Sequence, residues 1–94
     1  MKSVEELEVF QLAHQLTLRI YDVTRRFPRE EMFGIVRQLR RCASSACANL
    51  AEGAGRLNRA EYRQFVGIAK GSAAEAAYFL LLSRDLGSHV SAKP

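Results

Sequence analysis

Residues that interrupt regular structure are scarce in this chain. It has two prolines, no tryptophan, and no stretch rich in glycine and serine among its 94 residues. This scarcity argues against a linker or a long disordered tail. No segment alternates apolar and polar residues over the length of a strand, which argues against a β-sheet. We therefore expect one domain over residues 1–94, made of helices.

Cysteine and histidine are too few to form an obvious metal or redox centre. Cys42 and Cys47 lie five positions apart, on different faces of a helix, and no Cys-x-x-Cys pair occurs. His14 and His89 are far apart in the sequence, and the clustered serines have no plausible histidine partner. We expect free thiols in a reducing cytoplasm, no metal, no cofactor and no catalytic residue, and therefore a protein that is not an enzyme.

Long apolar runs are also missing. No run approaches the roughly 20 apolar residues that span a bilayer, and the polar, acidic N-terminal segment does not resemble a signal peptide. We expect a cytoplasmic protein without a membrane partner.

Apolar residues recur at helical spacing in three segments, about residues 4–27, 34–54 and 58–86. In the first segment, steps of four and three positions connect Val9, Ala13, Leu16, Ile20, Val23 and Phe27. This is the pattern of a helix that buries one face. Three amphipathic helices with short connections predict an all-α, antiparallel up-down bundle.

Local signals mark where two of these helices begin or end. Pro28 disfavours helical geometry at the residue before it, so it ends the first helix. Asn58 is followed three positions later by Glu61, the capping-box spacing of a helix start. Gly67 and Gly71 weaken the third helix. They mark either close backbone contacts or tolerated surface positions.

Glycines and polar residues gather at the end of the second helix. We expect Gly53 and Gly55 to end this helix, and Gly87 to end the third, through the left-handed conformation that glycine accepts. Asn49 and Glu52 lie just before the first of these ends. Because a helix end leaves about four carbonyls without partners, we favour a structural role for both residues over a ligand-positioning network.

The third segment carries more apolar surface than one neighbour can bury. Tyr78–Leu82 is an uninterrupted run of five large apolar residues, which point all round a helix axis. Residues 88–94 form a tail too short to cover this surface. We place Leu82 off the intramolecular core face and predict an oligomer interface that contains Tyr78, Leu81 and Leu82.

The positive charge is concentrated in the middle of the chain. The net charge is +4 and arginine supplies most of it. The candidate nucleic-acid-binding residues are Arg37, Arg40, Arg41, Arg56, Arg59 and Arg63. They form either a cationic strip that binds phosphate or a solvated surface with salt bridges to nearby glutamates. No aromatic residue is interleaved with these arginines, so we expect recognition of backbone charge and shape.

Several motifs are similar to those of a known family. The segments Leu7–Phe10, Phe27-Pro28, Phe33–Ile35 and Gln38–Arg41, and above all Ala48–Arg56 with its ANLAEGAGR sequence, resemble bacterial proteins of the 23S rRNA intervening-sequence type. The resemblance implies an up-down four-helix bundle. The family continues past Gly87 into a fourth helix, so we expect that helix to be missing or truncated here.

The same resemblance implies a function. Members related to the accessory protein of diversity-generating retroelements form homopentamers, and family proteins are commonly basic and thought to engage nucleic acid. We therefore expect a non-enzymatic bundle that self-assembles, as a pentamer by resemblance, and binds structured RNA or DNA. The alternative is a scaffold or adaptor with no nucleic-acid role, whose third helix docks a protein partner.

Overall fold

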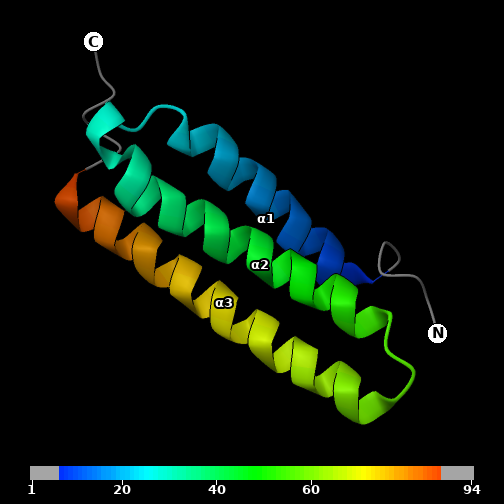
Figure 1. Ribbon diagram of the computed structural model, residues 1–94. Helices are drawn as coiled ribbons and strands as arrows, with labels where there is room; N and C mark the ends of the chain where they lie inside the picture. The colour runs from blue at the N-terminus through cyan, green and yellow to red at the C-terminus, as the bar shows by residue number, and fades with distance from the viewer. Residues whose placement is uncertain (1–6, 88–94) are drawn as a thin grey trace.

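A computed structural model describes residues 7–87, which form helices and no strand. The elements are α1 (Glu8–Thr24), the 3₁₀ turn η2 (Arg29–Glu31), the π-helical turn η3 (Met32–Val36), α2 (Arg37–Ala54) and α3 (Arg59–Leu86). Successive long helices run antiparallel, and α2 lies between α1 and α3 (Figure 1). This elongated body measures 50 × 19 × 17 Å. The predicted all-α antiparallel bundle with three helices is confirmed for the described residues.

The first helix ends earlier than its apolar pattern predicted. α1 stops at Thr24, and the next three N–H groups bond back only three residues, as Phe27 does to the Thr24 carbonyl at 3.1 Å. Pro28 explains this ending, because its ring disfavours α-helical geometry at Phe27. The predicted start of this helix at about residue 4, like the tail at 88–94, lies outside the described residues.

The third helix begins and ends as its local signals predicted. The N–H of Glu61 donates to Oδ1 of Asn58 at 2.8 Å, and Nδ2 of Asn58 donates to Oε1 of Glu61 at 3.2 Å. This reciprocal cap satisfies a helix-start donor that has no partner within the helix. At the other end Gly87 adopts φ 74°, and its N–H donates to the Arg84 carbonyl. Both ends therefore follow from short-range chemistry.

The second helix ends at Ala54, as predicted, but the left-handed conformation predicted for its glycines is wrong. Gly55 has φ −83°, in the right-handed region, and Gly53 lies inside α2. Gly87 is the one residue with positive φ between residues 7 and 87. Gly53 instead allows close packing, because a Cβ added there would lie 2.9 Å from Cβ of Phe65 on α3. The small side chain brings the end of α2 against the start of α3.

The main hydrophobic cluster lies at the end of the bundle where α1 ends, α2 begins and α3 ends. Its buried members are Ile20, Phe27, Ile35, Val36, Leu39 and Ala43. Phe79 and Leu82 of α3 are half-buried against this cluster. The placement of Leu82 off the core face is therefore wrong. The two residues are three positions apart, so a helix presents both on the same side.

α1 is buried along only part of its predicted apolar stripe. Ile20 and Phe27 are buried as expected, but Val9 and Leu16 are each 51% exposed. α1 packs along α2, and few of its residues approach α3. In place of the missing apolar contacts, Thr17 is buried within 3.2 Å of the Ala43 carbonyl. Because no other helix among residues 7–87 lies on its second flank, α1 leaves much of the stripe open.

An apolar groove consequently runs between α1 and α3, with α2 as its floor. Two hollows of about 300 and 100 Å³ lie along it. Its walls and floor are formed by apolar residues from all three helices, including Val9, Ala13, Leu16, Ala46, Ala73 and Leu80. Almost all of the surface that lines the two hollows is apolar. This is the part of the bundle that a fourth helix or another molecule would cover.

α3 is long and apolar enough, by length and composition alone, to cross a membrane. The sequence analysis predicted no such segment, because it found no long apolar run. In α3, alanines and glycines raise the mean hydropathy without forming a run of large apolar residues. Lys70 and Glu75 lie within the helix. A single helix of this kind is weak evidence of a membrane span.

Candidate nucleic-acid interface

The six candidate arginines do not form one strip but two clusters. Arg37, Arg40 and Arg41, the N-terminal arginine cluster, lie on the first turns of α2. Arg56, Arg59 and Arg63, the C-terminal arginine cluster, lie beyond its other end and on the first turns of α3. Arg41 lies 13 residues before Ala54, the last residue of α2, so at 1.5 Å per residue the helix separates the clusters by roughly 20 Å. The two clusters are therefore independent candidate sites.

The C-terminal arginine cluster is partly neutralised within the chain. Nη2 of Arg56 lies 2.7 Å from a carboxylate oxygen of Glu52. The Arg56 guanidinium also stacks on Phe65, with its central carbon 4.8 Å from the ring centroid. Arg59 and Arg63 remain exposed, and neither forms an ion pair with another described residue. Two of the three charges are thus available to an external anion.

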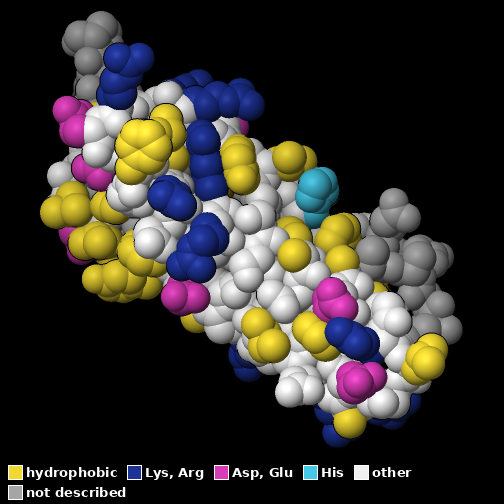
Figure 2. All heavy atoms as spheres, in the orientation of Figure 1, with side chains coloured by type: hydrophobic (Ala, Val, Ile, Leu, Met, Phe, Trp, Pro, Cys, Tyr) yellow, Lys and Arg dark blue, Asp and Glu magenta, His cyan; other side chains and the backbone are white. Residues whose placement is uncertain are grey.

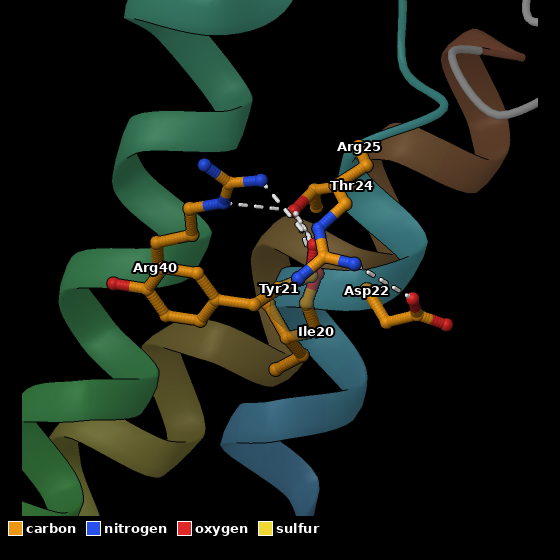
Figure 3. Close-up of polar contacts among 6 residues, drawn as sticks. All are labelled: Ile20, Tyr21, Asp22, Thr24, Arg25 and Arg40. Carbon is orange, nitrogen blue, oxygen red and sulfur yellow. Dashed lines mark hydrogen bonds and ion pairs between the residues drawn. The ribbon is translucent and has the colours of Figure 1, made fainter.

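In the N-terminal arginine cluster, Arg40 is fixed against α1 (Figure 3). Its Nε donates to Oγ1 of buried Thr24 at 2.9 Å, and Nη2 donates to the Tyr21 carbonyl at 3.3 Å. The guanidinium lies 4.7 Å from the Tyr21 ring centroid. Thr24 in turn donates to the Ile20 carbonyl at 2.6 Å. Arg40 therefore joins α1 to α2 while it keeps its charge without a carboxylate partner.

Arg37 and Arg41 are exposed on one face of the first turns of α2, four positions apart. Arg41 donates to Oε1 of Gln38 at 2.9 Å. Neither arginine forms an ion pair with any residue in the described part of the chain. Two like charges at this spacing cost about 0.2–0.5 kcal/mol in an isolated helix. An external anion placed between them would relieve that repulsion.

The surroundings of this cluster are basic as well. Residues 19–41 hold seven arginines and three acidic residues. Figure 2 shows lysine and arginine side chains gathered beside hydrophobic ones over the end of the molecule where α1 ends and α2 begins. Asp22 is engaged by Arg25 at 3.4 Å. This end of the bundle therefore carries an excess of positive charge.

The sequence interpretation missed the aromatic residues of this surface. Tyr21 of α1 and Phe33 of η3 line an open hollow of about 600 Å³ together with Arg37, Arg40 and Arg41. Phe33 is 84% exposed. Tyr21 is sixteen positions before Arg37, and the turn at residues 25–31 brings it back beside α2. The sequence could have indicated one of these aromatic residues, because Phe33 lies four residues before Arg37 and next to Gly34.

The other predicted site residues have mainly structural contacts. Nδ2 of Asn49 donates to the Ser45 carbonyl at 2.8 Å, and Glu52 pairs with Arg56. These are the contacts that a structural role requires. Tyr78 and Leu81 are exposed on α3, as an interface with another molecule requires.

The described residues offer little chemistry beyond charge and stacking. Within residues 7–87, no group of three or more histidine, cysteine, aspartate or glutamate residues could hold a metal ion. Cys42 and Cys47 are free. Burial raises the pKa of the Cys42 thiol, Glu75 adds to this, and Arg41 opposes it. Cys42 is therefore a protonated core residue at neutral pH.

Comparison with known proteins adds one match. The family model described as 23S rRNA-intervening sequence protein matches residues 5–93, nearly the whole chain. None of the curated proteins matches the chain.

Proposed function

Since the chain belongs to the 23S rRNA-intervening sequence protein family, we propose that it is a non-enzymatic helical bundle that self-assembles and binds nucleic acid. The observation that carries the binding proposal is the N-terminal arginine cluster. It presents three guanidinium groups at the basic end of the bundle, with no carboxylate partner among residues 7–87. Guanidinium forks suit phosphate, because each can donate two parallel hydrogen bonds.

Titration of labelled structured RNA and DNA at several salt concentrations tests this proposal. Each phosphate neutralised by an arginine steepens the fall of log K against log salt by about 0.7–0.9. The double variant Arg37→Gln/Arg41→Gln therefore weakens binding and flattens the slope by roughly 1.5. A matched control is Arg59→Gln/Arg63→Gln, which removes two exposed arginines with the same spacing from the other cluster.

Two results would contradict nucleic-acid binding by this cluster. The first is the absence of affinity at low salt, or an affinity that does not change with salt. The second is an equal loss in the two double variants, which would assign the binding to net charge and not to this surface.

We propose that a second copy of the chain covers the apolar groove between α1 and α3. The argument is self-complementarity. The chain offers a groove lined by small residues such as Ala46 and Ala73, and also exposed apolar ridges at Leu12 on α1 and Tyr78 and Leu81 on α3. A ridge of one copy fits the groove of another by ordinary helix packing. The pentameric number remains an expectation from the family resemblance.

Light scattering over a range of concentrations measures this assembly. We expect a mass above that of the 10.5 kDa chain, which falls when Leu16→Glu introduces a charge at the groove. A monomer at every concentration contradicts self-assembly. A different protein that co-purifies stoichiometrically, without nucleic acid, would favour the scaffold function instead.

We also propose a cytoplasmic location without a membrane partner. The free thiols of Cys42 and Cys47 suit a reducing compartment. Lys70 and Glu75 would be costly inside a bilayer, at about 2.5–3.5 kcal/mol for a charged residue at the centre of a spanning helix. Recovery of the full-length protein in the membrane fraction after a high-salt wash would contradict this location.

A further inference from the structure

The hollow beside the N-terminal arginine cluster combines two chemistries that a purely electrostatic surface does not need. Its volume of about 600 Å³ falls within the ~300–1,000 Å³ of ordinary ligand sites. Its lining combines three arginines with apolar and aromatic residues: Arg37, Arg40, Arg41, Tyr21, Met32, Phe33 and Val36. No acidic residue lines it. The hollow therefore suits a ligand that has both a flat apolar face and negative charge.

Phe33 is the residue that binding of phosphate alone leaves unexplained. Its side chain is 84% exposed, although phenylalanine is among the residues most often buried. It lies in η3, a π-helical turn in which Gly34 departs from helical geometry. The exposed ring is available for stacking against a ligand at the same end of α2 as the unpaired arginines.

Part of the lining of the hollow is held in place before any ligand arrives. Arg40 is hydrogen-bonded to Thr24 and to the Tyr21 carbonyl, and it stacks on the Tyr21 ring. Arg40 and Tyr21 are therefore fixed, and a ligand need not order them. Arg37 and Arg41 have no such ties to α1. Arg41 donates only to Gln38 of its own helix, so both guanidinium groups can follow a phosphate.

Resting on the proposed nucleic-acid function, we propose that this hollow binds an unpaired nucleotide of an RNA or DNA strand. The base stacks on Phe33, and the adjoining phosphates lie against Arg37 and Arg41. Bases within a duplex are stacked on one another and cannot offer their faces to a side chain. The site therefore selects single-stranded, looped or bulged segments, whereas the arginine charge alone would accept a duplex equally well.

Binding of two RNAs with the same number of phosphates tests this selectivity, one unstructured and one fully paired. We expect the wild-type protein to prefer the unstructured RNA. Loss of a base–aromatic stack of about 1–3 kcal/mol corresponds to a roughly 5- to 150-fold weaker affinity, so Phe33→Ala weakens binding to the unstructured RNA by this factor. The affinity of the Phe33→Ala variant for the duplex stays unchanged. The matched control is Leu57→Ala, which truncates another exposed apolar residue in the connection between α2 and α3.

Phe33→Trp supplies a direct reading of stacking, because the chain has no other tryptophan. We expect the unstructured RNA to quench its fluorescence and the duplex to leave it unchanged. Because Phe33 is exposed, we expect its variants to fold, and far-UV circular dichroism checks this for each variant.

The possible failures are distinguishable. If Arg37→Gln flattens the salt dependence for both RNAs while Phe33→Ala changes neither affinity, the stacking site is overturned and the proposed function survives. Equal weakening of both RNAs by Phe33→Ala also overturns it. If neither RNA binds at low salt, the proposed function and this site fail together.

Discussion

Thr24 of α1 and Arg40 of α2 form a buried polar connection between the two helices. Oγ1 of Thr24 accepts from Nε of Arg40 at 2.9 Å and donates to the Ile20 carbonyl at 2.6 Å. Thr24 is 1% exposed, so a lost hydrogen bond there is not replaced by water. The same contact fixes one wall of the hollow that also holds Phe33. Stability and the candidate site are therefore linked through one hydroxyl group.

Thr24→Val tests this connection, because valine keeps the shape and removes the hydroxyl. We expect the free energy of unfolding to fall by about 1.5 kcal/mol, the scale of a hydrogen bond to a charged group. Urea denaturation followed by circular dichroism measures the change. The control is Ser44→Ala, because the exposed Ser44 hydroxyl bonds only to carbonyls of its own helix. Equal stability of Thr24→Val and the wild type would contradict the prediction.

Leu81 and Leu82 are neighbours in the sequence with different surroundings. Leu82 packs against the core cluster, whereas Leu81 is 44% exposed. We expect Leu82→Glu to lower the free energy of unfolding by about 2 kcal/mol, because it removes apolar contacts and brings a charge against the core. We expect Leu81→Glu to stay within about 0.5 kcal/mol of the wild-type value.

Light scattering separates the two leucines in a second way. Leu81→Glu leaves a folded protein of lower mass if this face of α3 contributes to assembly. A stable Leu82→Glu protein that has only lost its oligomeric state would contradict the observed packing and restore the placement of Leu82 off the core face.

Glycines of α2 and α3 differ in the space around them. An added Cβ at Gly53 meets Phe65 Cβ at 2.9 Å, whereas one at Gly67 or Gly71 meets nothing within 4 Å. We therefore expect Gly53→Ala to destabilise by about 1–3 kcal/mol through overpacking. Gly71→Ala stabilises by up to about 1 kcal/mol through helix propensity. Thermal denaturation of both variants measures this, and a stabilised Gly53→Ala protein would show that α3 shifts away without cost.

Much of the fold follows from short-range patterns. The cap at Asn58 and Glu61 and the stop at Gly87 depend on groups a few residues apart, so the sequence identifies them. The buried face of α1 could not be predicted in the same way. Its apolar stripe is wide, and whether Thr17 or Leu16 is buried depends on which side of α1 has a neighbour. With α2 on one flank only, the threonine is inside and the leucine faces the groove.

The candidate site, like the fold, could be predicted from the sequence only in part. Arg37, Arg40 and Arg41 were identified because they are close together in the sequence. Their separation from Arg56 follows from the length of α2 and could have been calculated. The proximity of Tyr21 to Arg40 could not, because it depends on the turn after α1 and on how α1 packs against α2.

The Cys42 thiol makes the stability of the folded protein depend on pH. Burial, and then Glu75, raises the pKa of its thiol above the ordinary value, while Arg41 opposes this. In the unfolded chain a cysteine ionises near pH 8.5. Between that pH and the higher folded pKa, the folded protein keeps a proton that the unfolded chain has lost. The contribution of Cys42 to stability is therefore complete below about pH 8.5 and declines as the pH rises further.

Urea denaturation at a series of pH values from about 7 to 10 measures this contribution in the wild type and in Cys42→Ala. We expect the difference in free energy of unfolding between the two proteins to be constant at neutral pH and to shrink above about pH 8.5, because only the wild type has a thiol there to ionise on unfolding. All other ionisable groups are common to the two proteins, so their contributions cancel in the difference. A gap that stays constant to pH 10, or widens, would show that the thiolate is no less stable in the core than in water.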